Sequence, residues 1–176
     1  MANFAALRGA ACAAMLFALG ACGTTRDASS ALPHPDFASP KVVEQSSPLQ
    51  CVPYARSESG VQIYGDAATW WGQAQGRYPR SNIPTEGAVL VINSVGDDGR
   101  GHVAVVRRIV SAREIVVDHA NWLNRGEVDL DSPVIDISPH NDWSQVRVWF
   151  TPEGHYGGRA YSARGFIYPF QDLASR

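Results

Sequence analysis

Three Val- and Ile-rich segments follow one another in the middle of the chain, and they limit what this sequence can fold into. They span Ala88–Asn93, His102–Val110 and Glu114–His119, and short runs rich in Gly, Asp and Ser separate them. β-branched residues favour strands, and turn residues at this spacing join strands that run antiparallel. Two similar segments follow at Val146–Phe150 and Gly165–Tyr168. The second half of the chain is therefore expected to form an antiparallel β-sheet.

Helical signals come before the strands. A segment that starts at Cys51 has a proline early, at Pro53, and a glycine at its end, Gly60, which is typical of a short helix. Asp66 is the expected N-cap of a second helix. Helices followed by an antiparallel meander indicate an α+β domain. Residues 151–164 are expected to be an extended loop that returns to the last strand.

The composition sets limits on the class of protein. A length of 176 residues fits one domain with a tail. Hydrophobic residues make up 45% of the chain and charged residues 18%, which are globular values and exclude wholesale disorder. The 15 Lys and Arg residues stand against 17 Asp and Glu residues, so the chain lacks the strongly basic balance of a dedicated nucleic-acid binder.

The N-terminus carries the pattern of a secretory signal peptide at residues 1–21. Arg8 is the charged residue of this segment, and an uncharged, mostly apolar run that ends in small residues follows it. That run is shorter than the about 20 apolar residues of a transmembrane helix. The alternative interpretation is a buried N-terminal helix. Residues 22–48 are rich in Ser, Ala, Pro and Thr without hydrophobic periodicity, so a flexible linker is expected there.

The end of the apolar run is more specific. Leu19-Gly20-Ala21-Cys22 resembles a bacterial lipobox, which implies that Cys22 is diacylated and becomes the mature N-terminus. Two or more acyl chains anchor a protein stably to a membrane. Gly23 stands where an aspartate would retain a lipoprotein in the inner membrane. The resemblance therefore implies an outer-membrane lipoprotein that faces the periplasm.

One cysteine remains as a candidate for chemistry. Of the 3 cysteines, Cys12 lies in the predicted signal peptide and Cys22 is the expected lipidation site, which leaves Cys51. A single cysteine with histidines elsewhere in the chain is a candidate nucleophile. At a helix N-terminus the helix dipole favours the thiolate, which is the reactive form. The alternative role of Cys51 is that of a small buried apolar residue.

The candidate base is His102, which begins an apolar strand after a glycine-rich turn. If this strand and the next pair as a hairpin, the start of the first lies near the end of the second. His102 and the group Asp118–Asn121 would then share one edge of the sheet. Two structural histidines, His102 and His119, are the alternative. These side chains lack a compact metal-ligand spacing, and Asp97-Asp98-Gly99 lacks the alternating carboxylates of a calcium loop, so no metal site is predicted.

Five short motifs, in this order along the chain, resemble those of the CHAP domain. They are Gln50-Cys51-Val52-x-Tyr54-Ala55, Trp70-Trp71, Pro84-x-x-Gly87-Ala88-Val89-Leu90-Val91, Gly101-His102-Val103-Ala104-Val105-Val106 and Ala120-Asn121-Trp122. The name denotes cysteine, histidine-dependent amidohydrolases and peptidases related to the NlpC/P60 and papain-like enzymes. The resemblance implies a papain-like α+β fold, with N-terminal helices packed on an antiparallel sheet. The catalytic domain would span residues 49–152, and residues 153–176 would form a C-terminal extension packed on it.

The resemblance also implies roles for single residues. Cys51 would be the nucleophile and His102 the general base. Many family members carry an acidic residue two positions before the asparagine that Asn121 matches, whereas this chain carries His119 there. Related NlpC/P60 enzymes use a histidine as the third residue, so His119 is expected to orient His102. Asp118 is the rival if the strand is bulged, and Asn121 would support either arrangement or stabilise a turn.

The function expected from the resemblance is hydrolysis of amide bonds in peptidoglycan, by an amidase or an endopeptidase without a cofactor. The protein would be a monomer tethered to the membrane through Cys22, with peptidoglycan as its partner and no nucleic acid. Trp122 is expected to be exposed to ligand and the other tryptophans to be structural. One alternative is a related amidase that acts on a small thiol–polyamine conjugate. The other is a non-catalytic lipoprotein that binds peptidoglycan or serves as an envelope scaffold.

Overall fold

The computed structural model describes residues 39–93 and 99–170, all of which lie in the compact unit Asp36–Arg176. The predicted signal peptide, the lipobox with Cys22 and residues 22–38 of the predicted linker lie outside the described residues.

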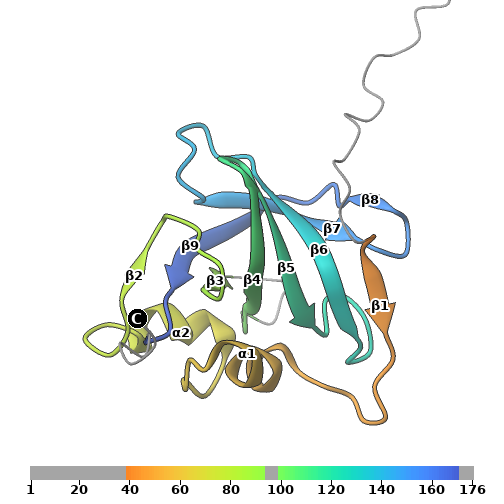
Figure 1. Ribbon diagram of the computed structural model, residues 1–176, viewed down its shortest axis with the longest axis horizontal. Helices are drawn as coiled ribbons and strands as arrows, with labels where there is room; N and C mark the ends of the chain where they lie inside the picture. Colours follow the sequence, from red (N-terminus) through yellow and green to blue (C-terminus); the bar gives the residue numbers. More distant parts are fainter. Residues whose placement is uncertain (1–38, 94–98, 171–176) are drawn as a thin grey trace, which may run out of the picture. The chain divides into compact units, whose positions relative to one another are not determined.

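A closed antiparallel β-barrel forms the centre of this unit (Figure 1). Its strands are β3 (Val89–Ile92), β4 (His102–Ser111), β5 (Glu114–Ala120), β6 (Val128–Asp136), β7 (Gln145–Phe150) and β9 (Tyr161–Ile167). They pair in the order β6-β5-β4-β3-β9-β7, and β6 also pairs with β7. This last pairing joins the two ends of the row and closes the barrel.

Short strands and helices lie around the barrel. Strand β1 (Lys41–Val43) pairs with β6, β2 (Arg80–Ser81) pairs with β9, and β8 (His155–Tyr156) pairs with β7. The helices are α1 (Cys51–Ser59), the 3-10 helix η1 (Ala67–Thr69) and α2 (Trp70–Gln73). Helix α1 begins at Cys51 and is followed by Gly60 in the left-handed conformation, as predicted. Asp66 precedes η1 but its side chain makes no capping hydrogen bond.

The prediction of a papain-like α+β fold is wrong, because the described residues form a closed six-stranded barrel with two short α-helices. Among the barrel strands, β6 is the one that the sequence pattern does not indicate. Its apolar pattern is interrupted by Asp129, Asp131 and Pro133, and Asp131 has a φ of 53°, which marks a β-bulge. Strand β9 is longer than predicted, since it begins at Tyr161 inside the segment expected to be a loop.

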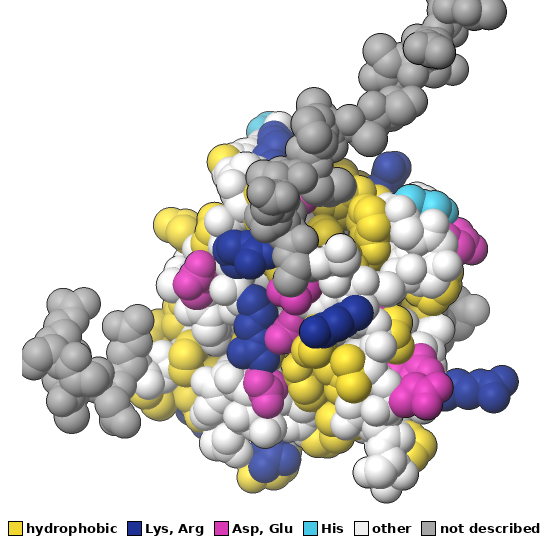
Figure 2. Space-filling view, turned by 45° about the vertical axis from the view of Figure 1, so that its right-hand side comes forward, with side chains coloured by type: hydrophobic (Ala, Val, Ile, Leu, Met, Phe, Trp, Pro, Cys, Tyr) yellow, Lys and Arg dark blue, Asp and Glu magenta, His cyan; other side chains and the backbone are white. Residues whose placement is uncertain are grey.

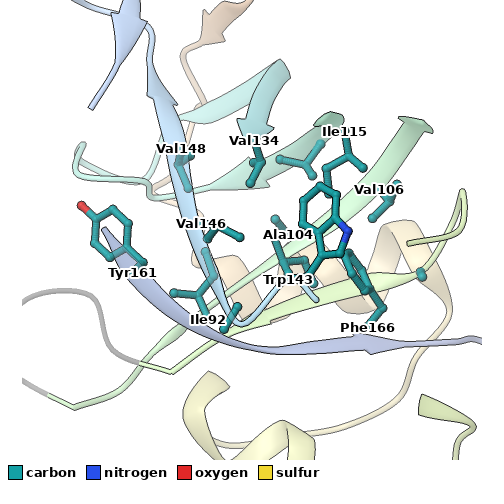
Figure 3. Close-up of a cluster of buried hydrophobic side chains, with 14 of the residues drawn as sticks. Ile92, Ala104, Val106, Ile115, Val134, Trp143, Val146, Val148, Tyr161 and Phe166 are labelled. Atoms are coloured by element: carbon teal, nitrogen blue, oxygen red, sulfur yellow. The ribbon is translucent and has the colours of Figure 1, made fainter. Parts of the chain in front are cut away.

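The barrel buries apolar side chains on both faces of β3 and β4. Side chains such as Ile92 and Ala104 fill its interior, where they pack with Trp143 and Phe166 (Figure 3). Alternate residues of the same strands point outward and pack under the helices; they are Val89, Val91, Val103 and Val105, which contact Ala55 and Trp70. A strand buried on both faces needs apolar residues at every position, which explains the unbroken Val and Ile runs.

Helix α1 is fastened to the outside of the barrel by charged side chains. The Arg107 guanidinium donates to Glu58 of α1 and to Asp118 of β5, both at 2.6 Å. The second carboxylate oxygen of Asp118 accepts the N–H of Asp131 in the β6 bulge at 2.8 Å. The contacts fix α1 against β4, β5 and β6 together, so the orientation of its first residue follows from the barrel.

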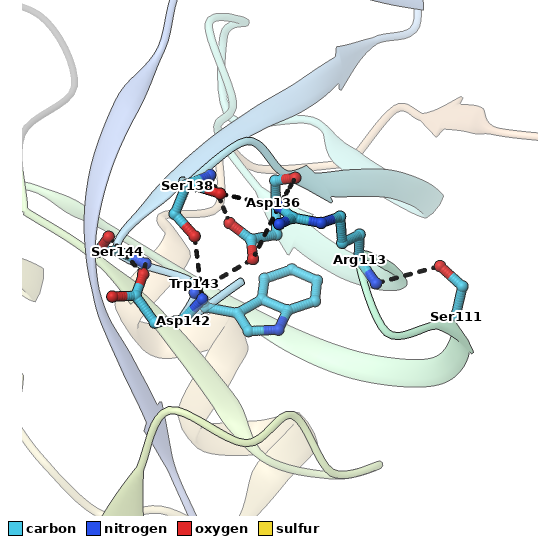
Figure 4. A network of polar contacts seen from close by, with 7 residues as sticks. All are labelled: Ser111, Arg113, Asp136, Ser138, Asp142, Trp143 and Ser144. Carbon is cyan, nitrogen blue, oxygen red and sulfur yellow. Dashed lines mark hydrogen bonds and ion pairs between the residues drawn. The ribbon is translucent and has the colours of Figure 1, made fainter. Parts of the chain in front are cut away.

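The turn between β6 and β7 has its own polar network (Figure 4). The buried Asp136 carboxylate accepts the N–H groups of Ser138 at 2.7 Å and of Trp143 at 3.4 Å. Arg113 lies 3.6 Å from the same carboxylate and donates to the carbonyl of Ser138 at 2.9 Å. This network holds the turn that directs Trp143 into the barrel and brings β7 alongside β6.

On the face seen in Figure 2, basic and acidic side chains are interspersed with apolar ones, and neither sign of charge forms a large continuous patch. Within residues 39–93 and 99–170, the helices are too short to include an apolar segment that could cross a membrane.

Gly126 packs closely against the segment that leads into α1. The N–H of Leu49 donates to the Gly126 carbonyl at 2.9 Å, and Gly126 has a φ of +90°. A Cβ at this position would lie 2.7 Å from Pro48. The close approach fixes the chain two residues before Cys51.

We expect Gly126→Ala to destabilise the protein by roughly 2–4 kcal/mol, because it adds backbone strain and a collision with Pro48. Gly87→Ala is the matched control, since Gly87 has a φ of +82° but a Cβ there would meet no atom within 4 Å. Urea unfolding of the two variants measures the difference. Equal losses of unfolding free energy would show that the contact with Pro48 contributes nothing.

Candidate active site

Cys51 is the first residue of α1 and lies on the wall of a cavity of about 530 Å³. His102, Asn121, Gln50 and Arg100 also line this cavity. The structure therefore brings the predicted nucleophile and the predicted base to one cavity, from elements that are far apart in the sequence. Cys51 is half-buried and is a free thiol.

The electrostatic surroundings of Cys51 differ from the expectation for a helix N-terminus. Burial raises the pKa of the Cys51 thiol above its ordinary value, and the backbone groups of Val103 and Val52 lower it only in part. The thiol form therefore predominates at neutral pH. Helix position alone does not generate a thiolate here, so a reaction at this sulfur needs a base.

His102 and His119 form a buried pair at the ends of β4 and β5. Nε2 of His102 lies 2.9 Å from Nδ1 of His119, and the two side chains are 3% and 1% exposed. Burial lowers the pKa of both rings well below the ordinary value, and in His119 the neighbouring His102 adds to the effect. Both imidazoles are thus neutral at physiological pH, and Nδ1 of His102 is the nitrogen left to accept a proton.

Trp122 covers the histidine pair. Its ring centroid lies 4.8 Å from that of His102 and 5.4 Å from that of His119. The expectation that Trp122 is exposed to ligand is wrong, since only 3% of the residue is accessible. Strand β5 ends at Ala120, and the next residue, Asn121, has a φ of 60°; this left-handed residue turns the following Trp122 back over the rings. The indole excludes water from the pair and so contributes to its low pKa.

Asp118 lies on the other face of β5 and does not join the site. Its carboxylate is occupied by Arg107 and by the N–H of Asp131. The pairing of β5 with β6 does shift between Val117 and His119, but the bulge leaves Asp118 pointing outward. His119 is therefore the residue that contacts His102.

Asn121 contacts the residue before the nucleophile and not the histidine pair. Its side-chain Nδ2 donates to Oε1 of Gln50 at 2.8 Å, and its backbone N–H donates to the carbonyl of Glu127. Gln50 belongs to the first of the five motifs, but no pattern in the sequence indicates this contact. The amide of Gln50 is held beside Cys51 at the cavity wall.

The opposite wall of the cavity depends on Gly101. The N–H of Ala68 donates to the carbonyl of Arg100 at 2.8 Å, which joins η1 to the start of β4. A Cβ on Gly101 would lie 2.7 Å from the nitrogen of Ala68 and from the carbonyl oxygen of Ile92. Only glycine fits at this approach, so it sets the position of His102 next along the chain. In the described part of the chain, no group of three or more His, Cys, Asp or Glu side chains is arranged to hold a metal ion.

Comparison with known families agrees with the resemblance seen in the motifs. Residues 42–121 match the family model described as CHAP domain, which confirms the resemblance for this segment. The matched segment contains Cys51, His102, His119 and Asn121. The family consists generally of hydrolases that act as amidases or peptidases. A search of the curated proteins finds no match.

The buried histidines predict a loss of stability in mild acid. In the unfolded chain each ring takes a proton near pH 6.5, whereas in the folded protein it stays neutral, so the free energy of unfolding falls as the pH falls. Between pH 8 and pH 5.5 the two rings together account for about 3 kcal/mol. Asp129 partly offsets this, because burial raises its pKa to about 6 and its folded form takes up a proton in the same range.

The variant His119→Gln should reduce that loss by about 1.4 kcal/mol, measured by urea unfolding at the two pH values. His155→Gln is the control, because the carbonyl of Tyr156 and the carboxylate of Glu153 raise the pKa of His155, an effect of the opposite sign. An acid-induced loss that is the same in His119→Gln and in the unmodified protein would contradict the assignment of a neutral buried ring.

Proposed function

We propose, from the match of residues 42–121 to the CHAP domain family, that this protein is a peptidoglycan hydrolase that cleaves an amide bond by a Cys-His thiol mechanism. The observation that carries the proposal is the common cavity of Cys51 and His102, with the far nitrogen of His102 held by His119. This is the arrangement of a nucleophile, a base and a residue that orients the base.

The reaction begins from neutral groups. Nδ1 of His102 removes the proton of the Cys51 thiol as the sulfur attacks the amide carbon, which forms a tetrahedral intermediate. In this proposal the backbone N–H of Cys51, at the start of α1, stabilises the oxyanion, and Gln50 lines the same cavity. The imidazolium of His102 then gives its proton to the leaving amine, and a thioester remains. Water hydrolyses the thioester to the carboxylic acid and restores the thiol.

The walls of the cavity are compatible with a peptide that carries both signs of charge. The carboxylate of Asp66 and the guanidinium of Arg100 both line it, and both residues are exposed. Peptide stems of the cell wall present amino and carboxyl groups close together. The proposed substrate is therefore such a stem, cut either at its junction with the sugar or between its residues.

The proposed location follows from the sequence. A lipid on Cys22 would hold the protein at the outer membrane, and the predicted linker over residues 22–48 would carry the domain to the periplasmic wall. A monomer suffices for the chemistry, since every residue named in the mechanism comes from one chain.

The test of the function is incubation of the purified full-length protein with peptidoglycan, followed by mass analysis of the released fragments. We expect fragments with newly exposed carboxyl and amino ends, and none from Cys51→Ala. Masses that differ by a whole stem peptide indicate an amidase, and shorter ones an endopeptidase. If both proteins bind peptidoglycan and release the same products, the protein is a wall-binding lipoprotein and not a hydrolase.

A second measurement addresses the role of His102. The rate of Cys51 alkylation by iodoacetamide should fall roughly tenfold at pH 7.5 in His102→Ala, because the buried thiol loses the base that deprotonates it. The control is His155→Ala, which removes an exposed histidine. Unchanged alkylation in His102→Ala would show that His102 does not activate the sulfur.

A further inference from the structure

The protons on the histidine pair can be assigned from the direction of their hydrogen bond. For His102 to accept a proton at Nδ1, its neutral ring must carry its hydrogen on Nε2. That hydrogen is donated to Nδ1 of His119 across the 2.9 Å contact. His119 must then carry its own hydrogen on Nε2. The opposite assignment would put a hydrogen on Nδ1 of His102 and prevent it from acting as a base.

Nε2 of His119 is buried without a hydrogen-bond partner among the described residues. The residue is 1% exposed, so bulk water does not reach this nitrogen. A buried N–H without an acceptor costs about 1–3 kcal/mol. The tautomer that makes His102 a base is therefore unfavourable unless a nearby group favours a hydrogen on this atom.

The neighbouring strand, β6, provides a carboxylate at Asp129. Asp129 of β6 is the cross-strand partner of His119, and directly opposite residues of an antiparallel pair have Cβ atoms about 4.5–5.5 Å apart on the same face. The bulge at Asp131 shifts the register of β6, so that Asp129 comes to lie opposite His119. Asp129 is 3% exposed.

The surroundings of Asp129 are polar and hold its side chain in place. Asn124 donates from Nδ2 to Oδ2 of Asp129 at 2.8 Å, and Asn124 itself lines the cavity. Glu127 is a second acid close to this carboxylate. His119 faces Asp129 as its cross-strand partner.

We propose that Asp129 is the acidic positioning residue of this site, whose negative charge holds His119 with its hydrogen on Nε2 and so keeps Nδ1 of His102 ready to accept the thiol proton. The inference rests on the proposed function for its role in catalysis, but the tautomer it assigns is a property of the resting protein. The chain lacks an acid at position 119, and the adjacent strand supplies one instead. When His102 takes the proton of Cys51, the same charge stabilises the positive charge on the pair.

The first test observes the tautomers directly in the unmodified protein. Nitrogen-15 NMR of the full-length protein at pH 7.5 distinguishes the protonated nitrogen in each ring, and spectra of His102→Gln and His119→Gln serve only to assign the signals. We expect a hydrogen on Nε2 of both His102 and His119. A hydrogen on Nδ1 of either ring would overturn the proposal, whether or not the protein hydrolyses peptidoglycan.

The second test is Asp129→Asn, which keeps an oxygen for Asn124 but removes the charge. We expect a mixture of tautomers at His119. We also expect kcat on peptidoglycan to fall roughly tenfold with an unchanged KM, which is a part of the about 10²–10⁴-fold rate enhancement that a positioned base contributes. Glu127→Gln is the matched control, because it removes the same charge two residues away; it should retain both the tautomer and kcat.

The pH profile separates a positioning role from a structural one. Burial, with a further contribution from Glu127, raises the pKa of Asp129 to about 6, so activity should fall below about pH 6 as the carboxylate takes up a proton. That acidic limb should disappear in Asp129→Asn and persist in Asp129→Glu, which keeps the charge. An acidic limb and a tautomer that are both unchanged in a folded Asp129→Asn would contradict the proposal.

Discussion

The closure of the barrel by β6 is the constraint on which the rest of the site depends. This strand pairs with β5 on one side and with β7 on the other, and it carries the bulge at Asp131. Without the second pairing, the interior would be an apolar sheet face open to water. With it, the ends of β4 and β5 become the rim of a closed core, and side chains at that rim are buried while their neighbours still reach solvent. The histidine pair occupies this rim, and the bulge decides which β6 side chain lies opposite it.

Burial at the rim selects the chemistry that the site can perform. A histidine and a cysteine in contact with water can rest as an imidazolium and a thiolate, but desolvation here disfavours both charges. The resting state is a thiol beside neutral rings. In the proposed mechanism, charge develops only when substrate fills the cavity and the sulfur attacks, so the groups that matter there are those that favour charge separation at that moment. The fixed dipoles at the start of α1 and the carboxylate of Asp129 would have this effect.

The local elements could be predicted well from the sequence, and the global architecture poorly. The start and end of α1, the strands from 88 to 119 and the proximity of His102 to His119 all follow from short-range patterns, because periodicity and hairpin pairing are local properties. The barrel does not follow, since its closure requires β3 to pair with β9 and β6 with β7. Strand β6 has no regular apolar alternation, and that of β9 ends at Arg164. The analogy with papain-like enzymes led to the expectation of N-terminal helices packed on an antiparallel sheet. The described part of this chain instead has two short α-helices and a sheet that closes into a barrel.

The same distinction explains which site residues the sequence could identify. Alternation along one strand separates His119 from Asp118 correctly, because both lie on β5. It fails at Asn121, whose positive φ ends the alternation and turns its side chain toward Gln50. Alternation along β5 cannot identify Asp129, because the residue opposite His119 depends on a bulge that adds one residue to β6. A one-residue slip in that register would replace the carboxylate with Val128 or Leu130, and the pair would face a hydrocarbon side chain. The carboxylate opposite His119 is thus specified by the pairing of two strands, and in the proposed mechanism this acid from across the sheet is what makes a histidine at position 119 compatible with a base at His102.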